Sequence, residues 1–202
     1  MTTTLLPAFP LDIVVFPGED QYLHIFEERY LQLINELKDS KGEFAIPYSS
    51  NGKLNGYGVL VQIDNVFGES PEGTLYISVS GTRTFKLRNL IDKFPGKLYP
   101  AAEIEPLNKE VLPEDQAALE ALRPGFVELL SMFRGDQSPV SIPSLKSSYF
   151  AATLMRLPVE KKLELISISS EKERVKWISN ELKLAILIYN TEQDLQGQHF
   201  LN

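Results

Sequence analysis

The sequence predicts an α+β fold in which a β-rich, barrel-like N-terminal part precedes a C-terminal α-helical bundle. Up to about residue 107, short apolar or alternating runs are separated by glycine-containing turns, a pattern typical of antiparallel strands. After residue 107, apolar residues recur three and four positions apart, which indicates amphipathic helices. We therefore expect a β domain over residues 1–107 and a helical subdomain over residues 108–202.

The first two strands are predicted on either side of a Pro17-Gly18 turn. An apolar segment precedes the turn and contains Pro10, and a short strand with His24 follows it. Pro10, Pro17 and Gly18 are interpreted as turn residues, and Gly18 is free to adopt positive φ. Because strand side chains alternate between faces, His24 should point away from the face of its two apolar neighbours.

One helix is expected to interrupt the strands, over residues 27–38. Tyr30, Leu33, Ile34 and Leu37 fall at helical spacing. Acidic residues in its first turn, among them Glu27, suit the positive end of the helix dipole.

The remaining strands are predicted from their apolar and alternating residues. They are expected at residues 44–48, 58–63, 74–79, 84–88 and 99–107. A tight connection at Gly81-Thr82 should join the third and fourth of these, and Phe85 shows the alternation of the fourth.

The C-terminal half is predicted to contain several helices. One opens at Pro113 and runs to about Phe133, and Pro124 should kink or split it. Ser144 is expected to cap the next helix, and Pro158 begins another. A capping box at residues 170–173 starts the last helix. Its apolar face comprises Val175, Ile178, Leu182, Ala185, Ile186 and Tyr189.

Composition and charge exclude several kinds of protein. The net charge is −7, and residues 1–107 carry nine Lys or Arg against 14 Asp or Glu. Binding to nucleic acids or anionic membranes needs clustered positive charge, so the acidity disfavours both. The lack of cysteine excludes disulfides, thiolate metal sites and cysteine nucleophiles. With no signal peptide and no apolar run of membrane-spanning length, we expect a cytoplasmic location.

No sequence motif predicts chemistry. The P-loop pattern is absent, and the serines and lysines lie in polar helix- or loop-like sequence rather than around an activated nucleophile. His24 would need acidic partners such as Glu27 or Glu28 to act as a ligand or acid–base group, and a local hydrogen bond is the simpler interpretation. We expect no catalytic residue, no cofactor and no metal.

Residues 6–30 read LPAFPLDIVVFPGEDQYLHIFEERY. Their order resembles the opening of the N-terminal substrate-binding domain of Lon proteases. The similarity extends through residues 58–63, 72–81 and 99–107 and, more weakly, into the helical half. The family signature in this chain consists of Pro10, Pro17, Gly18, His24, Glu27, Arg29, Tyr30, Gly58, Gly81 and Phe85. One departure is that the family's arginine before the phenylalanine is displaced to Arg83.

The resemblance implies a PUA-like pseudobarrel followed by a helical bundle. In the family this unit recognises or tethers protein substrates, whereas the ATPase and Ser-Lys protease parts follow it. The chain stops before those parts, so we expect a stand-alone, non-enzymatic module that binds polypeptides or a partner protein. An adaptor role in proteolysis or protein quality control would be consistent with such binding. The signature residues are expected to be structural, with Glu27 supporting the helix start and Arg29 holding the opening strand or the Pro17-Gly18 turn.

Two other functions remain open at this point. Arg83, Lys86, Arg88, Lys93 and Lys97 form a positive stretch that an RNA-binding barrel could use, although a solvated strand face explains them more simply. A small-molecule sensor with a pocket between barrel and helices is the other alternative. For the polypeptide-binding function, we expect the β domain to hold the recognition surface and to prefer neutral or basic segments.

Overall fold

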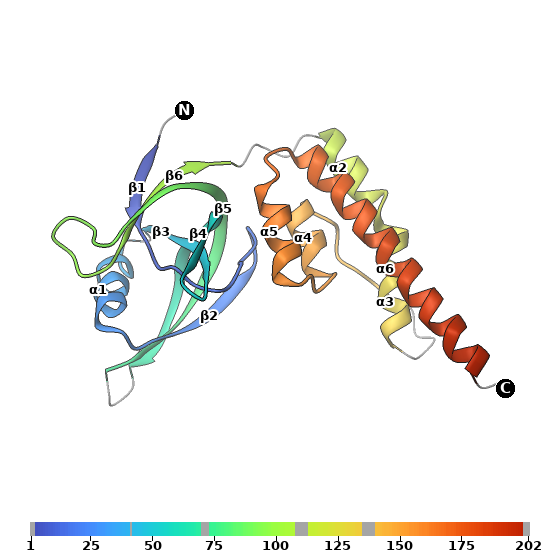
Figure 1. The fold of residues 1–202 in the computed structure, drawn as a ribbon, viewed down its shortest axis with the longest axis horizontal. Coiled ribbons are helices and arrows are strands. Elements are labelled where there is room, and N and C mark those ends of the chain that lie inside the picture. Colours follow the sequence, from blue (N-terminus) through green and yellow to red (C-terminus); the bar gives the residue numbers. More distant parts are fainter. Residues whose placement is uncertain (1–2, 41, 70–72, 108–112, 135–139, 200–202) are drawn as a thin grey trace. The chain divides into compact units, whose positions relative to one another are not determined.

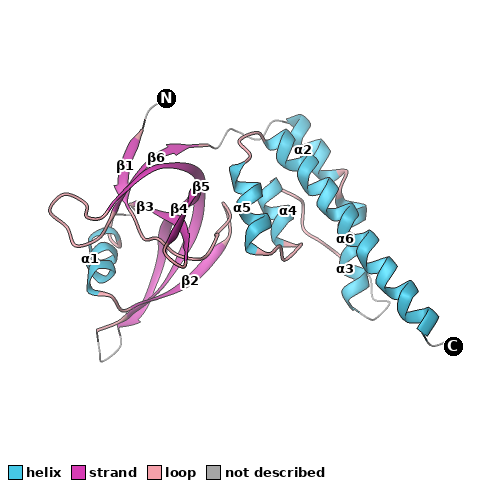
Figure 2. Cartoon of the chain, in the orientation of Figure 1, coloured by secondary structure: helices cyan, strands magenta, loops and turns pink. Residues whose placement is uncertain are grey.

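The computed structural model describes residues 3–40, 42–69, 73–107, 113–134 and 140–199. The chain forms two compact units: the sheet unit, residues 1–108 and 157–169, and the helical unit, residues 109–156 and 170–202. This division differs from the predicted one in residues 157–169, because helix α5 (Val159–Ser167) packs against strands of the sheet unit. The α+β fold, with a curled antiparallel sheet and C-terminal helices, is confirmed (Figures 1 and 2).

In the residues that the structure describes, the sheet unit is built on six antiparallel strands and two helices. They are β1 (Thr4–Pro7), β2 (Asp20–Ile25), α1 (Glu28–Leu37), β3 (Glu43–Ser50), β4 (Lys53–Glu69), β5 (Leu75–Ile91), β6 (Ala101–Pro106) and α5. The strand order is β1-β6-β5-β4-β3, and β2 pairs with the first part of β5. Parallel bridges of Ala8 with Ala45 and of Leu11 with Tyr48 bring the chain after β1 against β3, so the sheet curls round on itself.

The inside of this curl is the core of the sheet unit. Phe85 of β5 and Leu60 of β4 are almost fully buried there, with Ala8, Ala45 and Ile104 packed around them. Gly58 lies directly opposite Phe85 in the β4–β5 ladder. These two signature residues are therefore part of the hydrophobic core, where burial of apolar side chains stabilises the fold.

The predicted turn at Gly81-Thr82 is wrong, because β5 continues through it as one 17-residue strand. Gly81 forms an isolated bridge with Pro17, and a Cβ atom on Gly81 would lie only 2.2 Å from the carbonyl oxygen of Phe16. A glycine is needed there because the Phe16-Pro17 backbone approaches the strand too closely for any side chain.

The helical unit contains α2 (Pro113–Glu120), α3 (Arg123–Arg134), α4 (Ser148–Thr153) and α6 (Glu171–His199). The first three pack against α6. The predicted split is confirmed, since α2 ends before Pro124 and the proline lies in the first turn of α3, where a missing N–H costs nothing.

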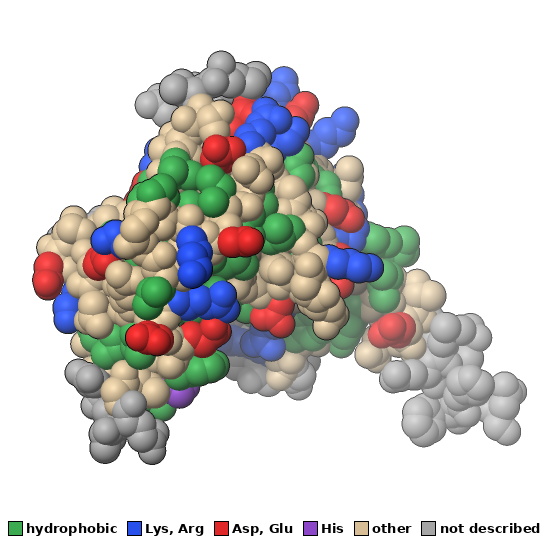
Figure 3. Space-filling model, turned by 60° about the vertical axis from the view of Figure 1, so that its left-hand side comes forward, with side chains coloured by type: hydrophobic (Ala, Val, Ile, Leu, Met, Phe, Trp, Pro, Cys, Tyr) green, Lys and Arg blue, Asp and Glu red, His purple; other side chains and the backbone are tan. Residues whose placement is uncertain are grey.

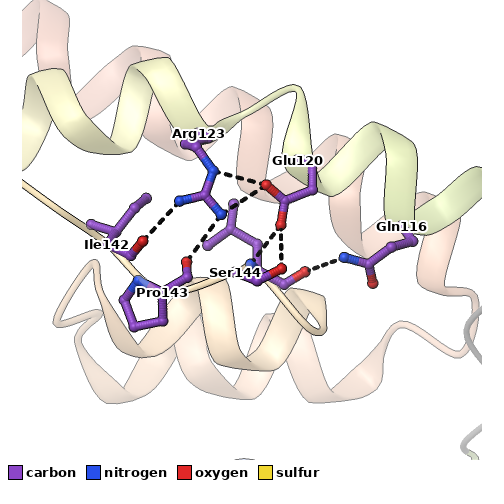
Figure 4. Close-up of polar contacts among 7 residues, drawn as sticks. Gln116, Glu120, Arg123, Ile142, Pro143 and Ser144 are labelled. Atoms are coloured by element: carbon purple, nitrogen blue, oxygen red, sulfur yellow. Dashed lines mark hydrogen bonds and ion pairs between the residues drawn. The ribbon is translucent and has the colours of Figure 1, made fainter.

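A polar network fixes the segment before α4 to α2 and α3 (Figure 4). Glu120 accepts hydrogen bonds from the Ser144 hydroxyl at 2.7 Å and from the Leu145 backbone N–H at 2.8 Å. Arg123 binds Glu120 at 2.8 Å and donates to the Ile142 carbonyl at 2.8 Å. Together the Arg123, Ser144 and Leu145 donors lower the pKa of Glu120 to about 2.

This network corrects the predicted cap of α4. The N-cap residue is Ser147, whose hydroxyl oxygen accepts a hydrogen bond from the Phe150 N–H at 3.1 Å. Ser144 instead donates to Glu120. Any of the serines in this run could have capped the helix by residue type, and Glu120, far away in sequence, decides between them.

The helical unit also buries an ion pair. Glu171 and Arg174 are 3% and 2% exposed, and their side chains meet at 2.7 Å. Ser148 at the start of α4 donates its N–H and its hydroxyl to Glu171, at 2.7 and 2.8 Å. The Arg174 guanidinium also lies over the Tyr149 ring, 4.6 Å from its centroid. The pair therefore joins α4 to the first turn of α6.

Candidate functional site

Strand β2 presents one buried and one exposed side. Ile25 is buried and Leu23 is partly buried, whereas Asp20, Tyr22 and His24 are exposed. The prediction that His24 points away from its two apolar neighbours is confirmed. The exposed side of β2 continues on β5, where Tyr76 lies directly opposite His24.

Aromatic rings from β2, from Phe26 just after it, and from β4 and β5 gather on this exposed side. The His24 and Tyr76 rings are stacked, with centroids 4.4 Å apart and planes within 5°. Tyr22 and Phe67 lie 5.7 Å apart, as do His24 and Phe26. We call these five residues, Tyr22, His24, Phe26, Phe67 and Tyr76, the aromatic face.

The rings of the aromatic face are open to water. Tyr22 is 71% exposed, Phe26 64%, Phe67 58% and Tyr76 51%. Burial of such large apolar side chains against a partner is favourable, and Tyr in particular is common at binding surfaces. In Figure 3 a histidine lies beside hydrophobic side chains at the lower edge of the molecule. The aromatic face is therefore the candidate functional site.

Polar groups border the aromatic face. The Ser80 hydroxyl oxygen lies 2.6 Å from a carboxylate oxygen of Asp20 and 2.5 Å from one of Asp64. The hydroxyl has one proton, so it can donate to only one of these carboxylates. The Asp20 and Asp64 carboxylates therefore make this end of the aromatic face negative. Near the other end, His24 Nε2 contacts the Thr74 hydroxyl at 3.0 Å, so its partner is distant in sequence rather than local.

Most of the predicted positive stretch is neutralised. Arg83 forms an ion pair with Glu43, Arg88 with Glu105 and Lys97 with Glu36. The Lys97 and Tyr99 donors lower the pKa of Glu36. On the view in Figure 3, basic and acidic side chains are interspersed. This arrangement differs from the continuous positive groove that nucleic-acid binding requires.

Pockets lie among the described residues of both units. The sheet unit has a pocket of about 400 Å³ lined by Pro10, Arg29, Tyr30 and Asp92, among others. In the helical unit a pocket of about 510 Å³ is lined mainly by apolar residues of α3 and the Leu154-Met155 segment.

Among the described residues, no group of three or more His, Cys, Asp or Glu could hold a metal ion. None of the described helices is long and apolar enough to cross a membrane.

Comparison with known families identifies the chain over almost its whole length. Residues 5–183 match the family model of the ATP-dependent protease La (LON) substrate-binding domain. The chain belongs to the Lon substrate-binding domain family.

Solved structures of Lon N-terminal domains share this fold. A Lon N-terminal domain protein from Xanthomonas campestris is 23% identical with a TM-score of 0.63, over 87% of this chain and 96% of that one. The N-terminal domain of the Mycobacterium avium complex Lon protease is 16% identical with a TM-score of 0.64, over 89% of this chain and 98% of that one. A search of curated proteins finds no match.

Part of the Lon-domain signature shapes the turn before β2. Gly18 has φ +81°, and the Glu19 N–H donates to the Phe16 carbonyl at 2.9 Å, which closes a turn around Pro17. The Glu19 carboxylate accepts the Phe16 N–H at 2.8 Å and lies 3.5 Å from the Lys162 ammonium. Lys162 of α5, which the sequence analysis did not single out, also contacts the Val14 carbonyl at 3.3 Å.

The second part of the signature differs from expectation. Arg29 binds the Glu27 carboxylate at 2.7 Å and lies 4.6 Å from the Tyr30 ring centroid, rather than holding the opening strand or the turn. Glu27 is the N-cap residue of α1 but makes no side-chain cap. Tyr30 is buried and stacks on Phe9 at 3.7 Å, and burial raises its pKa.

Most of the aromatic face was not predicted from the sequence. Of its five residues only His24 was singled out, for its chemistry and its place in the signature. A usable signal was present: Tyr22, His24 and Phe26 alternate with Leu23 and Ile25, so both sides of β2 are apolar or aromatic. A strand with one side in the core and aromatic rings on the other is a candidate for partner binding.

Proposed function

We propose that this chain is a non-catalytic module of the Lon substrate-binding family that binds flexible apolar polypeptide segments through the aromatic face. The observation that supports the proposal is the set of exposed rings that neighbour one another on β2, β4 and β5, with His24 and Tyr76 stacked and Tyr22 and Phe67 tilted. Covering such rings releases apolar surface from water and gives each ring a close contact. Holding a substrate for a separate protease in the cytoplasm is the role we assign to this binding.

Charge favours a polypeptide over a nucleic acid as the partner. Aromatic rings on a sheet can also stack on bases, but that mode needs positive side chains for the phosphates. Here Asp20 and Asp64 border the rings. These two carboxylates would repel a phosphate backbone and attract basic peptide segments.

Matched substitutions test this function. Binding of labelled unfolded peptides is measured by fluorescence anisotropy for the native chain, for a Tyr22→Ser/Phe67→Ser variant and for Phe133→Ser. Phe133 is 70% exposed but lies in the helical unit, so it controls for loss of an exposed ring. We expect the double variant to bind at least about tenfold more weakly, because exposed rings at binding centres dominate affinity, and the control to bind as the native chain does.

Two results would contradict the proposal. One is undiminished peptide binding by the double variant with its thermal unfolding unchanged. The other is equal weakening by Phe133→Ser, which would place the binding surface on the helical unit. Binding of a single-stranded RNA probe that competes with peptide at the same rings would favour the RNA alternative.

A further inference from the structure

We propose that the outer edge of β2 accepts an extended polypeptide segment as an added strand. Its alternate apolar side chains would lie beside the aromatic face, and a lysine or arginine in it would meet Asp20. This inference rests on the proposed function and specifies how the partner is held and what chemistry it has.

Strand β2 has an open edge. In the described part of the chain, β2 pairs with β5 alone. By contrast, β3 at the end of the sheet is partly covered by the segment after β1. An open strand edge presents backbone donors and acceptors that an extended peptide can pair with.

The phase of the ladder shows which groups lie on that edge. The Gly81 N–H donates to the Glu19 carbonyl at 3.0 Å, just before β2 begins. Backbone groups of successive residues alternate between the two edges of an antiparallel strand. It follows that the odd-numbered residues of β2 bond to β5, whereas the N–H and C=O groups of Tyr22 and His24 point to the open edge.

A side-chain contact agrees with this assignment. The Gln21 amide Nε2 donates a hydrogen bond to the Tyr22 carbonyl at 3.0 Å, at the exposed surface. The acceptor on the edge is thus satisfied by a side chain from the same strand. An incoming backbone N–H can take its place at little cost, because the displaced amide returns to water.

The side chains around the edge determine the chemistry of the occupant. Tyr22 and His24 project from β2 onto the aromatic face, so a neighbouring strand would place every second side chain beside their rings. Aromatic or aliphatic side chains suit those positions. The Ser80 hydroxyl can donate its proton to only one of the Asp20 and Asp64 carboxylates at a time. A cation beside them supplies a donor for the other carboxylate.

The test uses a blocked peptide, Lys-Phe-Thr-Phe-Thr-Phe-Lys, and two N-methylated forms of it. One form is methylated on its Phe nitrogens and the other on its Thr nitrogens, which removes N–H donors from one edge of the peptide at a time. If the peptide adds to β2, one form should bind at least about tenfold more weakly and the other within about threefold of the parent. Equal binding of both forms would overturn strand addition.

Charge is tested with a matched peptide in which Glu replaces both lysines. We expect the Lys peptide to bind about tenfold more tightly at low salt, with most of the difference lost in Asp20→Asn and at high salt. An equal or stronger affinity for the Glu peptide would overturn the assigned chemistry.

The outcomes separate this inference from the proposed function. If the Tyr22→Ser/Phe67→Ser variant binds the parent peptide as well as the native chain does, or if the native chain binds no peptide, both fail. If the aromatic substitutions abolish binding while both methylated forms behave alike, only strand addition fails. Self-association of the free chain that the peptide displaces would assign the edge to a second copy instead.

Discussion

Arg174 and Glu171 show how strongly two residues depend on each other inside the helical unit. Both are almost fully buried, and their hydrogen bonds to each other and to Ser148 compensate for the water they lose. The pair as a whole contributes less than its contacts suggest, since burying two charges is costly. Removing one partner has a much larger effect, because it leaves the other charge buried and uncompensated.

We expect Arg174→Ala to lower the free energy of unfolding by about 3–5 kcal/mol. Lys176→Ala, at an exposed position on the same helix, should change it by less than about 0.5 kcal/mol. Chemical denaturation of both variants measures the difference. Similar midpoints for the two variants would show that the buried pair does not hold α4 to α6.

Arg29→Ala should have only a small effect on stability. The Arg29 and Glu27 side chains are 47% and 42% exposed, and exposed ion pairs contribute at most about 1 kcal/mol. The sequence-based expectation that Arg29 holds the opening strand or the Pro17-Gly18 turn would have given this residue a larger effect on stability. Urea denaturation of Arg29→Ala checks this, and a loss above about 2 kcal/mol would require a contact other than Glu27.

Glu120 connects helices α2 and α3 to the segment before α4, and its low pKa makes this connection pH-dependent. The folded state stabilises the ionised Glu120 carboxylate more than the unfolded state does, so the pKa of Glu120 falls from 4.5 to about 2 on folding. Stability from this group is therefore fully present above about pH 4.5 and is lost as the pH falls towards 2.

Glu120→Gln is expected to destabilise the chain at pH 7. Between pH 4.5 and 2, the stability of this variant should fall less than that of the native chain. The difference in unfolding midpoint between native and variant chains should shrink across that range. Glu128→Gln, an exposed position of α3, is the control. Parallel pH curves for the native and Glu120→Gln chains would contradict the assignment.

For both strands and helices, the sequence predicted the element but not all of its surroundings. The alternation in Leu75, Ile77 and Val79 predicted a strand correctly, but Gly81 was interpreted as a turn, although its role is to admit the Phe16 backbone. That contact joins segments about 65 residues apart, and local patterns carry no information on it. Likewise, the apolar face of α6 was predicted, whereas Leu187, 62% exposed, shows that its outer side is also apolar.

At the scale of the whole molecule, the family resemblance and the α+β fold were predictable, whereas only the β2 part of the proposed binding surface had a signal in the sequence. The signature residues that carried the resemblance are mainly turn, core and helix-start residues, such as Gly18, Phe85 and Tyr30. Residues that maintain a fold are arranged in sequence patterns, but a binding surface is assembled by pairing of distant strands. Tyr22, Phe67 and Tyr76 come together only through the β2–β5 and β4–β5 ladders.

We expect the purified chain neither to hydrolyse ATP nor to cleave an unfolded substrate such as casein. The sequence lacks a phosphate-binding glycine loop and a supported nucleophile. Phosphate release and appearance of peptide fragments are the measurements. Turnover that survives stringent purification and disappears on substitution of one serine or lysine would contradict the proposed non-catalytic role.

The place of α5 in the chain has a consequence for biosynthesis. Lys162 contacts Val14 and Glu19, so the sheet unit needs a segment made about 150 residues after its first strand. On the ribosome, α2, α3 and α4 emerge before this segment does. During that time the Pro17-Gly18 turn before β2 lacks its contact with Lys162. Such late, long-range closure slows folding and leaves partly formed structure exposed to wrong associations. A nascent chain halted before residue 157 should therefore be more sensitive to protease around Val14 than one that extends past residue 169.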